Sequence, residues 1–383
     1  MAHAPVYLDC HATTPVDPRV LEAMLPYFTE LFGNPASAGH AWGWRAQEAV
    51  EQARRQIAGV IGASAREIIF TSGATESNNL AICGIADRSA TRRHIAVSAL
   101  EHKSVFERAQ RLERAGWRLS VLAVGRDGRL DLDALADSLG EDTALVSVMA
   151  ANNEIGVLQP LEAIGALAHA RGAVFHVDAA QAVGKIPIDV DRMHIDLLSL
   201  TGHKMYGPKG CGALYVRKRT ELMPLILGGG QERGLRSGTL NVPGIVGLGR
   251  ACAIAGAEMP EEAARLGRLR DRLLHGLQAR LDGVAVNGSL EFRLPNNLHV
   301  SFAGVDGASL LIGIGDIAVS SGSACSSASA TPSHVLRAIC GDAVPPASIR
   351  FGLGRFTTED EIDYAIEKFS TVVRHLREMA PAT

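Results

Sequence analysis

The sequence predicts an α/β protein with a large domain, in which helices flank a mostly parallel sheet, and a smaller α+β domain. Its 383 residues exceed the roughly 100–200 residues of an ordinary domain, so we expect two domains. Between about residues 66 and 216, short apolar runs alternate with helical stretches, as is typical of a parallel sheet covered on both faces. The apolar runs are 67–70, 94–97, 144–148, 174–177 and 196–200.

The chain beyond residue 240 has a different pattern. A helical segment rich in Ala, Glu and Arg follows Asn241-Val242-Pro243 and runs to about residue 281, and mixed strands and helices come after it. The first 15 or so residues indicate an extended arm. We therefore expect an arm at 1–15 that is part of the small domain, a large domain at 16–255, and a small C-terminal domain at 256–383.

The composition and the N-terminal residues indicate which class of ligand and which cell compartment to expect. A net charge of −3 gives no broad attraction to nucleic acid or to an acidic membrane, so we expect a small-molecule substrate. The N-terminus has no secretory pattern, and no apolar run approaches the roughly 20 residues that cross a bilayer, which favours a cytoplasmic protein without a membrane partner. Six cysteines without C-x-x-C spacing predict neither a disulfide framework nor a zinc module, and we expect no metal.

Polar and glycine-rich clusters follow three of the predicted strands. The segment 71–76 follows the first run, Asn152-Asn153-Glu154 follows the third, and Asp178 follows the fourth. Ligands gather at the carboxyl ends of the strands in such sheets. We therefore expect these clusters to form one site.

Asp178 and Lys204 lie on neighbouring loops of the predicted sheet, 26 residues apart. A lysine that forms a Schiff base with an aldehyde, and a carboxylate that keeps a pyridine nitrogen protonated, are the residues that pyridoxal 5'-phosphate requires. On these two residues alone, an ordinary strand-end aspartate and a surface lysine are an equally good interpretation. Their neighbours favour the cofactor.

The segment Gly73-Ala74-Thr75 follows a strand and opens a predicted helix that begins near Glu76. Backbone N–H groups at the positive end of a helix bind anions, so Ala74 and Thr75 are expected to hold a phosphate group. Thr201 and His203, just before the lysine, would add donors to the same phosphate. A lone Gly-Ala-Thr is more often only a turn with a cap.

The motifs taken together resemble those of the cysteine desulfurases, in the group similar to NifS and IscS within the class V aminotransferases. The resemblance covers nearly the whole chain, in order, and implies the pyridoxal-phosphate aminotransferase-like fold (fold type I). The matching motifs are Thr71-Ser72-Gly73-Ala74-Thr75-Glu76-Ser77-Asn78, Glu101-His102-Lys103, Asn152-Asn153-Glu154-Ile155-Gly156, His176-Val177-Asp178-Ala179-Ala180-Gln181, Thr201-Gly202-His203-Lys204, Arg236-Ser237-Gly238-Thr239-Leu240 and Ser321-Gly322-Ser323-Ala324-Cys325.

The resemblance implies a role for each of five further residues. His102 would stack on the cofactor ring and assist proton transfer, and Gln181 would form a hydrogen bond with the cofactor's phenolic oxygen. Asn153 would lie beside the ring or the substrate carboxylate. Arg350 would bind that carboxylate with its planar fork of donors, and Thr239 would reach the phosphate of the neighbouring subunit in a homodimer. The plainer alternatives are a satisfied polar residue for His102 and a surface strand arginine for Arg350.

Cys325 lies in a run of small residues without an apolar period, 320–329, which predicts a mobile loop. The resemblance implies that its thiolate takes the sulfur of L-cysteine as a persulfide and leaves L-alanine. Cys83 and Cys252 instead lie in apolar helical patterns, where buried and inert thiols are common. Cys10, near the arm expected to approach the cofactor, is a candidate for modulating the site, and its neighbour His11 occupies a position that varies within the group.

Three other interpretations stay open at this point. An aminotransferase or another lyase on the same fold would leave Cys325 without a role, and a selenocysteine-specific lyase would differ only in its substrate. A sulfur carrier or assembly scaffold would retain the fold without turnover. The sulfur acceptor is also open: we expect a protein, such as an iron–sulfur cluster scaffold or an enzyme of thio-cofactor, tRNA or DNA modification.

Overall fold

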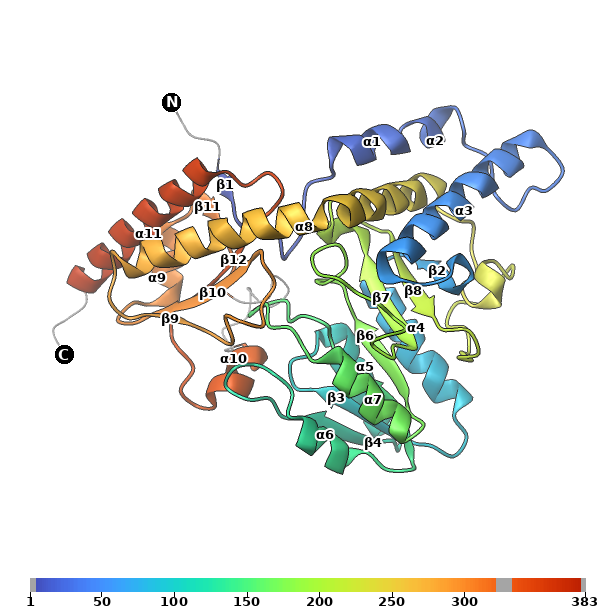
Figure 1. Ribbon diagram of the computed structural model, residues 1–383, viewed down its shortest axis with the longest axis horizontal. Coiled ribbons are helices and arrows are strands. Elements are labelled where there is room, and N and C mark those ends of the chain that lie inside the picture. Colours follow the sequence, from blue (N-terminus) through green and yellow to red (C-terminus); the bar gives the residue numbers. More distant parts are fainter. Residues whose placement is uncertain (1–4, 322–332, 380–383) are drawn as a thin grey trace.

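The computed structural model describes residues 5–321 and 333–379, and Cys325 therefore lies outside the described residues. The predicted α/β architecture is confirmed: a seven-stranded, mostly parallel sheet lies beside a smaller α+β assembly (Figure 1). All strands of the large sheet are parallel except β8, which runs antiparallel to both of its neighbours. Across the sheet the order is β2 (Ile68–Thr71), β8 (Gly212–Val216), β7 (Leu197–Thr201), β6 (Val174–Asp178), β5 (Thr143–Ser147), β3 (His94–Ser98) and β4 (Arg118–Leu122).

Helices cover both faces of this sheet, because most of its strands are apolar on both sides. On strand β3, Ala96 faces one core while Ile95 and Val97 face the other. The first core is closed by α3 (Ala41–Ile61), α7 (Leu161–Ala170) and the first half of α8 (Val242–Gln278), and the second by α4 (Ala74–Arg88) and α5 (Lys103–Arg114). Shorter helices complete this part: α1 (Pro18–Met24), α2 (Pro26–Thr29) and α6 (Leu132–Ser138).

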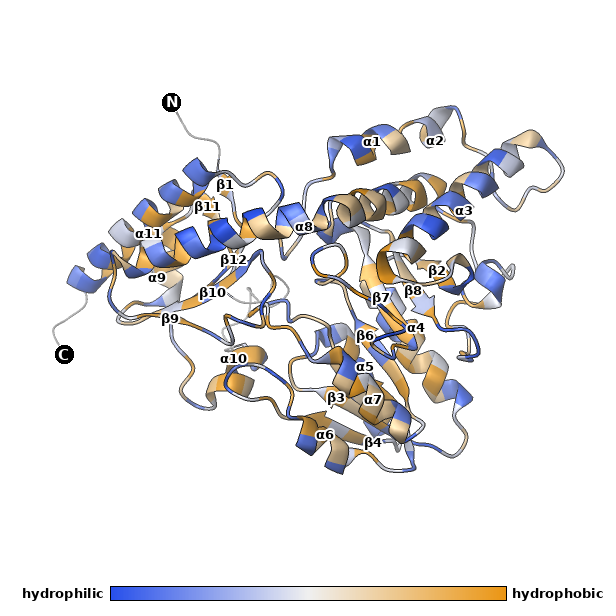
Figure 2. Cartoon of the chain, in the orientation of Figure 1, coloured by the Kyte–Doolittle hydropathy of each residue, from blue (hydrophilic) through white to orange (hydrophobic). Residues whose placement is uncertain are grey.

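The smaller assembly contains a three-stranded antiparallel sheet in the order β12 (Ser348–Gly352), β10 (Asn297–Phe302) and β9 (Val284–Val286). Its core lies between this sheet and the helices α9 (Gly307–Gly313), α11 (Glu359–Met379) and the second half of α8. Figure 2 shows that α11 carries both hydrophobic and hydrophilic residues, as expected of a helix with one buried face. The helix α10 (His334–Cys340) instead packs on residues of the large sheet's loops, including Leu100 and Ile155.

Helix α8 connects the two parts and spans 37 residues. Ile254 packs in the core beneath the large sheet, whereas Leu266 packs in the core of the smaller assembly. The predicted boundary between residues 255 and 256 falls inside this helix, and the division into domains stays a prediction. Within the described ranges, only α8 is long and apolar enough to span a membrane by composition, and 56% of its apolar window is buried, as in a core helix of a globular protein.

The N-terminal arm joins the two parts a second time. Strand β1 (Val6–Tyr7) pairs in parallel with β11 (Ile317–Ala318), and the backbone N–H of Cys10 donates to Gly352. Farther along, Thr14 accepts from the backbone N–H of Tyr206 at 2.9 Å and donates to the carbonyl of His203 at 3.0 Å. The arm therefore runs from the smaller sheet to the segment that carries Lys204.

Candidate active site

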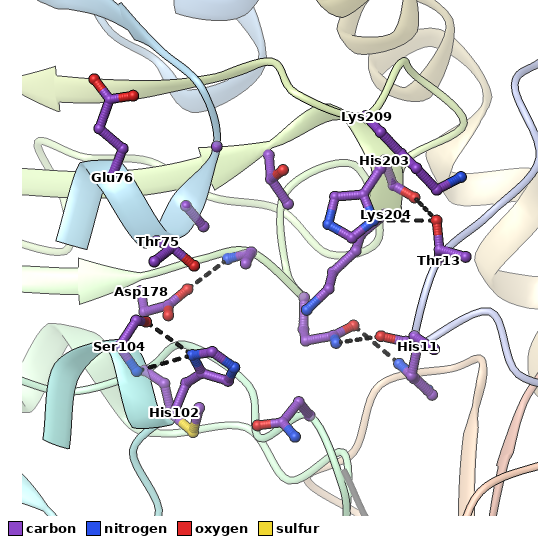
Figure 3. A pocket seen from close by; sticks show the side chains of 18 of the residues that line it. His11, Thr13, Thr75, Glu76, His102, Ser104, Asp178, His203, Lys204 and Lys209 are labelled. Atoms are coloured by element: carbon purple, nitrogen blue, oxygen red, sulfur yellow. Dashed lines mark hydrogen bonds between the residues drawn. The ribbon is translucent and has the colours of Figure 1, made fainter. Parts of the chain in front are cut away.

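A cavity of about 510 Å³ opens at the carboxyl ends of the parallel strands (Figure 3). It collects nearly every site residue that the sequence predicts within the described part of the chain. Thr239 is exposed outside this cavity. The predicted residues that line it are Ala74, Thr75, His102, Asn153, Asp178, Gln181, Thr201, His203, Lys204 and Arg350.

The first turn of α4 forms one wall of the cavity. Gly73 is the N-cap residue with φ of 148°, a conformation that favours glycine, and Ala74 and Thr75 begin the helix. A Cβ atom on Gly212 would lie 2.6 Å from the Gly73 Cα, so β8 approaches this turn too closely for a side chain. The backbone N–H groups of this turn are thus held at the cavity, as an anion site requires.

Asp178 ends strand β6 and is buried, with 5% of its surface exposed. Its Oδ2 accepts from Asn78 Nδ2 at 2.8 Å, and its Oδ1 accepts from the backbone N–H of Ala180 at 3.0 Å. Two hydrogen bonds therefore fix the carboxylate at the wall of the cavity. Sequence reasoning gave Asn78 no role, although a buried asparagine within a helix signals a polar partner.

His102 is the N-cap residue of α5, and its Nδ1 accepts from the backbone N–H of Ser104 at 3.2 Å. The Ser104 Oγ lies 2.8 Å from the same Nδ1 and accepts from Asn78 Nδ2 at 2.9 Å. Because Nδ1 accepts, the proton of the neutral ring is on Nε2. Burial lowers the pKa of His102 below its ordinary value, and this favours the neutral form.

Lys204 lies in a short 3₁₀ turn, Gly202–Lys204, directly after strand β7. Figure 3 shows its side chain extending into the cavity, with His203 beside it. His203 Nδ1 lies 3.1 Å from Thr13 Oγ1, so the arm holds this histidine as well. Burial and the adjacent Lys204 lower the pKa of His203 to about 4, so its ring is neutral near pH 7.

Arg350, on strand β12, is buried with 1% of its surface exposed. Its Nη1 donates to the Asn153 carbonyl at 2.8 Å, and its Nη2 donates to Asp9 Oδ1 at 2.7 Å. Its Nε has no partner among the described residues. The predicted surface-strand alternative is wrong for Arg350, because the guanidinium lies inside the protein and lines the cavity.

Gln181 and the cysteines singled out in the sequence lie in well-defined surroundings. Gln181 bonds to His11, from the arm, through both its amide oxygen and its amide nitrogen. Cys10 is buried, and burial raises the pKa of its thiol to about 12, which makes it a poor nucleophile. Cys83 and Cys252 are buried as predicted, and burial raises the pKa of both thiols.

Comparisons with known proteins agree with this geometry. The chain is 57% identical over 381 residues to "Cysteine desulfurase IscS" of Anaeromyxobacter sp. (strain K), covering 98% of this chain and 94% of that protein. It is 53% identical to "Cysteine desulfurase IscS" of Rickettsia africae (strain ESF-5), with 98% and 93% covered.

Two solved structures extend the likeness to the fold. A "NIFS-LIKE PROTEIN" aligns with a TM-score of 0.91 at 41% identity, covering 97% of this chain and 100% of that one. "SspA in complex with cysteine" aligns with a TM-score of 0.81 at 39% identity, covering 92% and 100%. The sequence pattern of the Aminotransferase class-V family matches residues 6–365. The chain therefore belongs to the aminotransferase class-V family.

Proposed function

We propose that this chain is a pyridoxal-phosphate-dependent cysteine desulfurase that converts L-cysteine to L-alanine and transfers the sulfur to Cys325. The observation that carries the proposal is the convergence of Lys204, Asp178 and Arg350 on one cavity. The names of the relatives support the reaction, and the structural neighbour solved in complex with cysteine supports L-cysteine as the substrate.

The residues of the cavity fit pyridoxal 5'-phosphate. When bound, this cofactor supplies an aldehyde that bonds to amines and a ring that accepts the electrons released at the substrate α-carbon. Lys204 would hold the aldehyde end, and the first turn of α4 with Thr201 and His203 would hold the phosphate. The negative charge of the buried Asp178 carboxylate would keep a proton on the ring nitrogen. Hydrogen bonds from Asn78 and Ala180 fix the position of this carboxylate.

Two side chains are suited to moving protons. The amine of Lys204, once released from the aldehyde, is the base that would take the proton from the substrate α-carbon. His102 would lie against the ring with a proton on Nε2, since its Nδ1 accepts from Ser104. A neutral imidazole with a fixed tautomer can deliver that proton to a developing negative charge.

Arg350 would bind the substrate carboxylate. Asp9 and the Asn153 carbonyl orient the guanidinium, and its Nε keeps a hydrogen available for the ligand. Asn153 itself lines the cavity beside this donor. The substrate would thus be oriented with its carboxylate at β12 and its amine toward Lys204.

Cys325 would accept the sulfur. Its thiolate would attack the substrate sulfur, so that an S–S bond forms, the substrate C–S bond breaks, and the electron pair of that bond leaves with the carbon skeleton. Protonation of the skeleton gives L-alanine, and Cys325 keeps a persulfide. An acceptor protein, such as a scaffold for iron–sulfur cluster assembly or an enzyme of thio-cofactor or tRNA modification, would then remove the sulfur in the cytoplasm.

The surface supports a homodimer. Large apolar side chains are exposed on and around α1, α2 and the start of α3, and others are exposed in the segment 223–227. A second copy would cover such exposed apolar side chains, and the exposed Thr239 would then reach the phosphate site of its partner. The exposed side chains are Leu21, Leu25, Phe28, Phe32, Trp42, Trp44, Met223, Leu225, Ile226 and Leu227.

The central test measures products and the site of sulfur together. The purified protein should show the visible absorbance of lysine-bound cofactor, release alanine and sulfide in equal amounts from L-cysteine and a thiol reductant, and gain one sulfur atom on Cys325 by mass spectrometry. Lys204→Ala should lose the visible band, and Cys325→Ser should keep the band but lose sulfide release. Amino-group transfer without sulfide would instead favour an aminotransferase, and a strong preference for selenocysteine would favour the selenium-specific lyase.

A further inference from the structure

We propose that His11 is a positioning residue that fixes the side-chain amide of Gln181, so that Gln181 presents only a hydrogen-bond donor to a ligand in the cavity. This role rests on the proposed cofactor site, and it belongs to a residue of the N-terminal arm, outside the loops that carry Lys204 and Asp178. The two side chains are 170 positions apart in the sequence and meet at the wall of the cavity.

The orientation of the Gln181 amide follows from one contact. Its terminal nitrogen lies 2.9 Å from the backbone carbonyl oxygen of His11. A carbonyl oxygen can only accept, so the Gln181 atom at this position must be the nitrogen and not the oxygen. The Gln181 Oε1 then lies 3.0 Å from His11 Nδ1, and that ring nitrogen must donate. One residue thus recognises both ends of the amide.

The protonation state of His11 makes this arrangement stable. The ring is fully buried, and burial together with the cations Lys185, Arg350 and Lys204 holds its pKa well below its ordinary value. A neutral imidazole has one N–H, and the contact with Gln181 requires it on Nδ1. Its Nε2 has no partner in the part of the chain that the structure describes, so nothing there favours the other tautomer.

A second donor acts on the same amide oxygen. Lys185 Nζ lies 3.3 Å from Gln181 Oε1, so both lone pairs of this oxygen are occupied. The amide nitrogen has two hydrogens, of which the His11 carbonyl takes one. The second hydrogen remains on a side chain that lines the cavity. Gln181 can therefore stabilise an anionic oxygen of a ligand but cannot accept a hydrogen bond from a hydroxyl group.

The backbone keeps the His11 ring in place. The preceding residue, Cys10, donates its backbone N–H to Gly352 at 2.9 Å, and Thr14 donates its own to His203 at 2.8 Å. His11 is thereby fixed between β12 and the segment that carries Lys204. Figure 3 shows the His11 side chain and the dashed contacts at this side of the cavity.

The test is the pH titration of the visible absorbance of the bound cofactor in the holoenzyme. A donor to the ring oxygen favours its anionic form and so lowers the pKa of the adjacent lysine linkage. His11→Ala should raise that pKa by about 0.5–1, a fraction of the roughly 1–2 expected for complete loss of a hydrogen bond to a charged group. His11→Asn, whose amide N–H can take the place of Nδ1–H, should restore most of the wild-type value.

Two controls separate positioning from a general loss of stability. His94 is also buried, but it lies at the start of β3 and bonds to Thr143 and Ser120. His94→Ala should therefore leave the titration unchanged. In a Gln181→Ala background, replacing His11 with Ala should cause no further rise in the pKa of the lysine linkage.

Three results would each overturn the role of His11. The pKa of the lysine linkage could be unchanged in His11→Ala, it could rise as much in His11→Asn as in His11→Ala, or the His11 replacement could raise it equally in the Gln181→Ala background. A wild-type protein that shows no visible band with added cofactor would overturn the proposed function itself, and the inference with it.

Discussion

The ion pair between Arg54 and Glu232 anchors the segment that carries Thr239, and breaking it is the most direct test of how that segment is held. Both side chains are buried, and Glu232 accepts from the two Nη atoms of Arg54 at 2.9 and 2.8 Å. Its Oε2 also accepts from the backbone N–H of Phe70 at 2.7 Å. Glu232→Gln keeps an acceptor for Phe70 but leaves the buried charge of Arg54 with only the partly exposed Glu51, 3.1 Å from its Nε, as a charged partner.

The size of the effect follows from this burial. Removing one partner of a buried pair costs about 3–5 kcal/mol of unfolding free energy. For 383 residues, an unfolding entropy of about 2.1 cal/mol/K per residue gives about 0.8 kcal/mol/K, so the melting temperature should fall by about 4–6 °C. Because Glu232 has a φ of 48°, its backbone is strained and should relax once the anchor is weakened.

The assay is thermal unfolding followed by circular dichroism, with sedimentation to report the oligomeric state. The matched control is the double variant Arg54→Met with Glu232→Gln, which also removes the buried charge of Arg54 and should recover at least half of the loss. A surface pair provides a second control: Arg118 and Asp142 are half-exposed, and Asp142→Asn should cost less than about 1 kcal/mol. A loss below about 1 kcal/mol for Glu232→Gln, or a double variant less stable than the single one, would refute the reasoning.

Three further predictions concern the cavity and its pH dependence. Asp178→Asn should lower kcat about 100-fold or more, because it would remove one partner of the charge pair that we propose between Asp178 and the cofactor. A loss below about 10-fold in steady-state assays would contradict this role. Gly212→Ala should weaken cofactor binding about 5- to 100-fold, because the added Cβ would lie 2.5 Å from the Leu200 carbonyl oxygen and 2.6 Å from the Gly73 Cα. An unchanged Kd for the cofactor in a fluorescence titration would contradict this close approach. Burial lowers the pKa of His176 to about 4, so the unfolded chain takes up a proton on this ring before the folded protein does as the pH falls. About 3 kcal/mol of the unfolding free energy present above pH 6.5 should therefore be lost by pH 4. In urea unfolding, the free energy of His176→Asn should fall less steeply with pH than that of the wild type, and equal slopes would exclude the effect.

The sequence predicted the strands of the large sheet well, because five of them are short apolar runs and three of these runs are followed by polar clusters. The predicted run at 174–177 is β6, and the predicted helix near Glu76 is α4, which begins two residues earlier. The edge strand β4 was not predicted, since its burial is partial and its residues, Arg118–Leu122, are mixed in polarity. Strand β8 was not predicted either, and its antiparallel direction depends on a connection that periodicity does not report.

The cavity was predicted less completely than the strands. Local motifs pointed to Lys204, Asp178 and the turn at Gly73, because each lies at the end of a strand. The residues that orient them come from distant segments: Asn78 reaches Asp178 across 100 positions, and Arg350 reaches Asp9 across 341. Pairings over such separations leave no periodic signal in one sequence. The roles of Thr239 and Cys325 stay predictions.

The pairing of the N-terminal arm with β11 limits when the cofactor pocket can form during synthesis. The partners of β1 lie in β11, about 310 residues later, so the first strand leaves the ribosome long before its partner exists. At about 5–20 residues per second, this interval is roughly 15–60 s. Throughout it, the arm cannot be anchored at both ends: Thr14 can bond to His203 and Tyr206 once that segment has been made, but β1 still has no strand to pair with. A competent cofactor pocket should therefore form only near the end of translation, after the large sheet has folded around an incomplete wall.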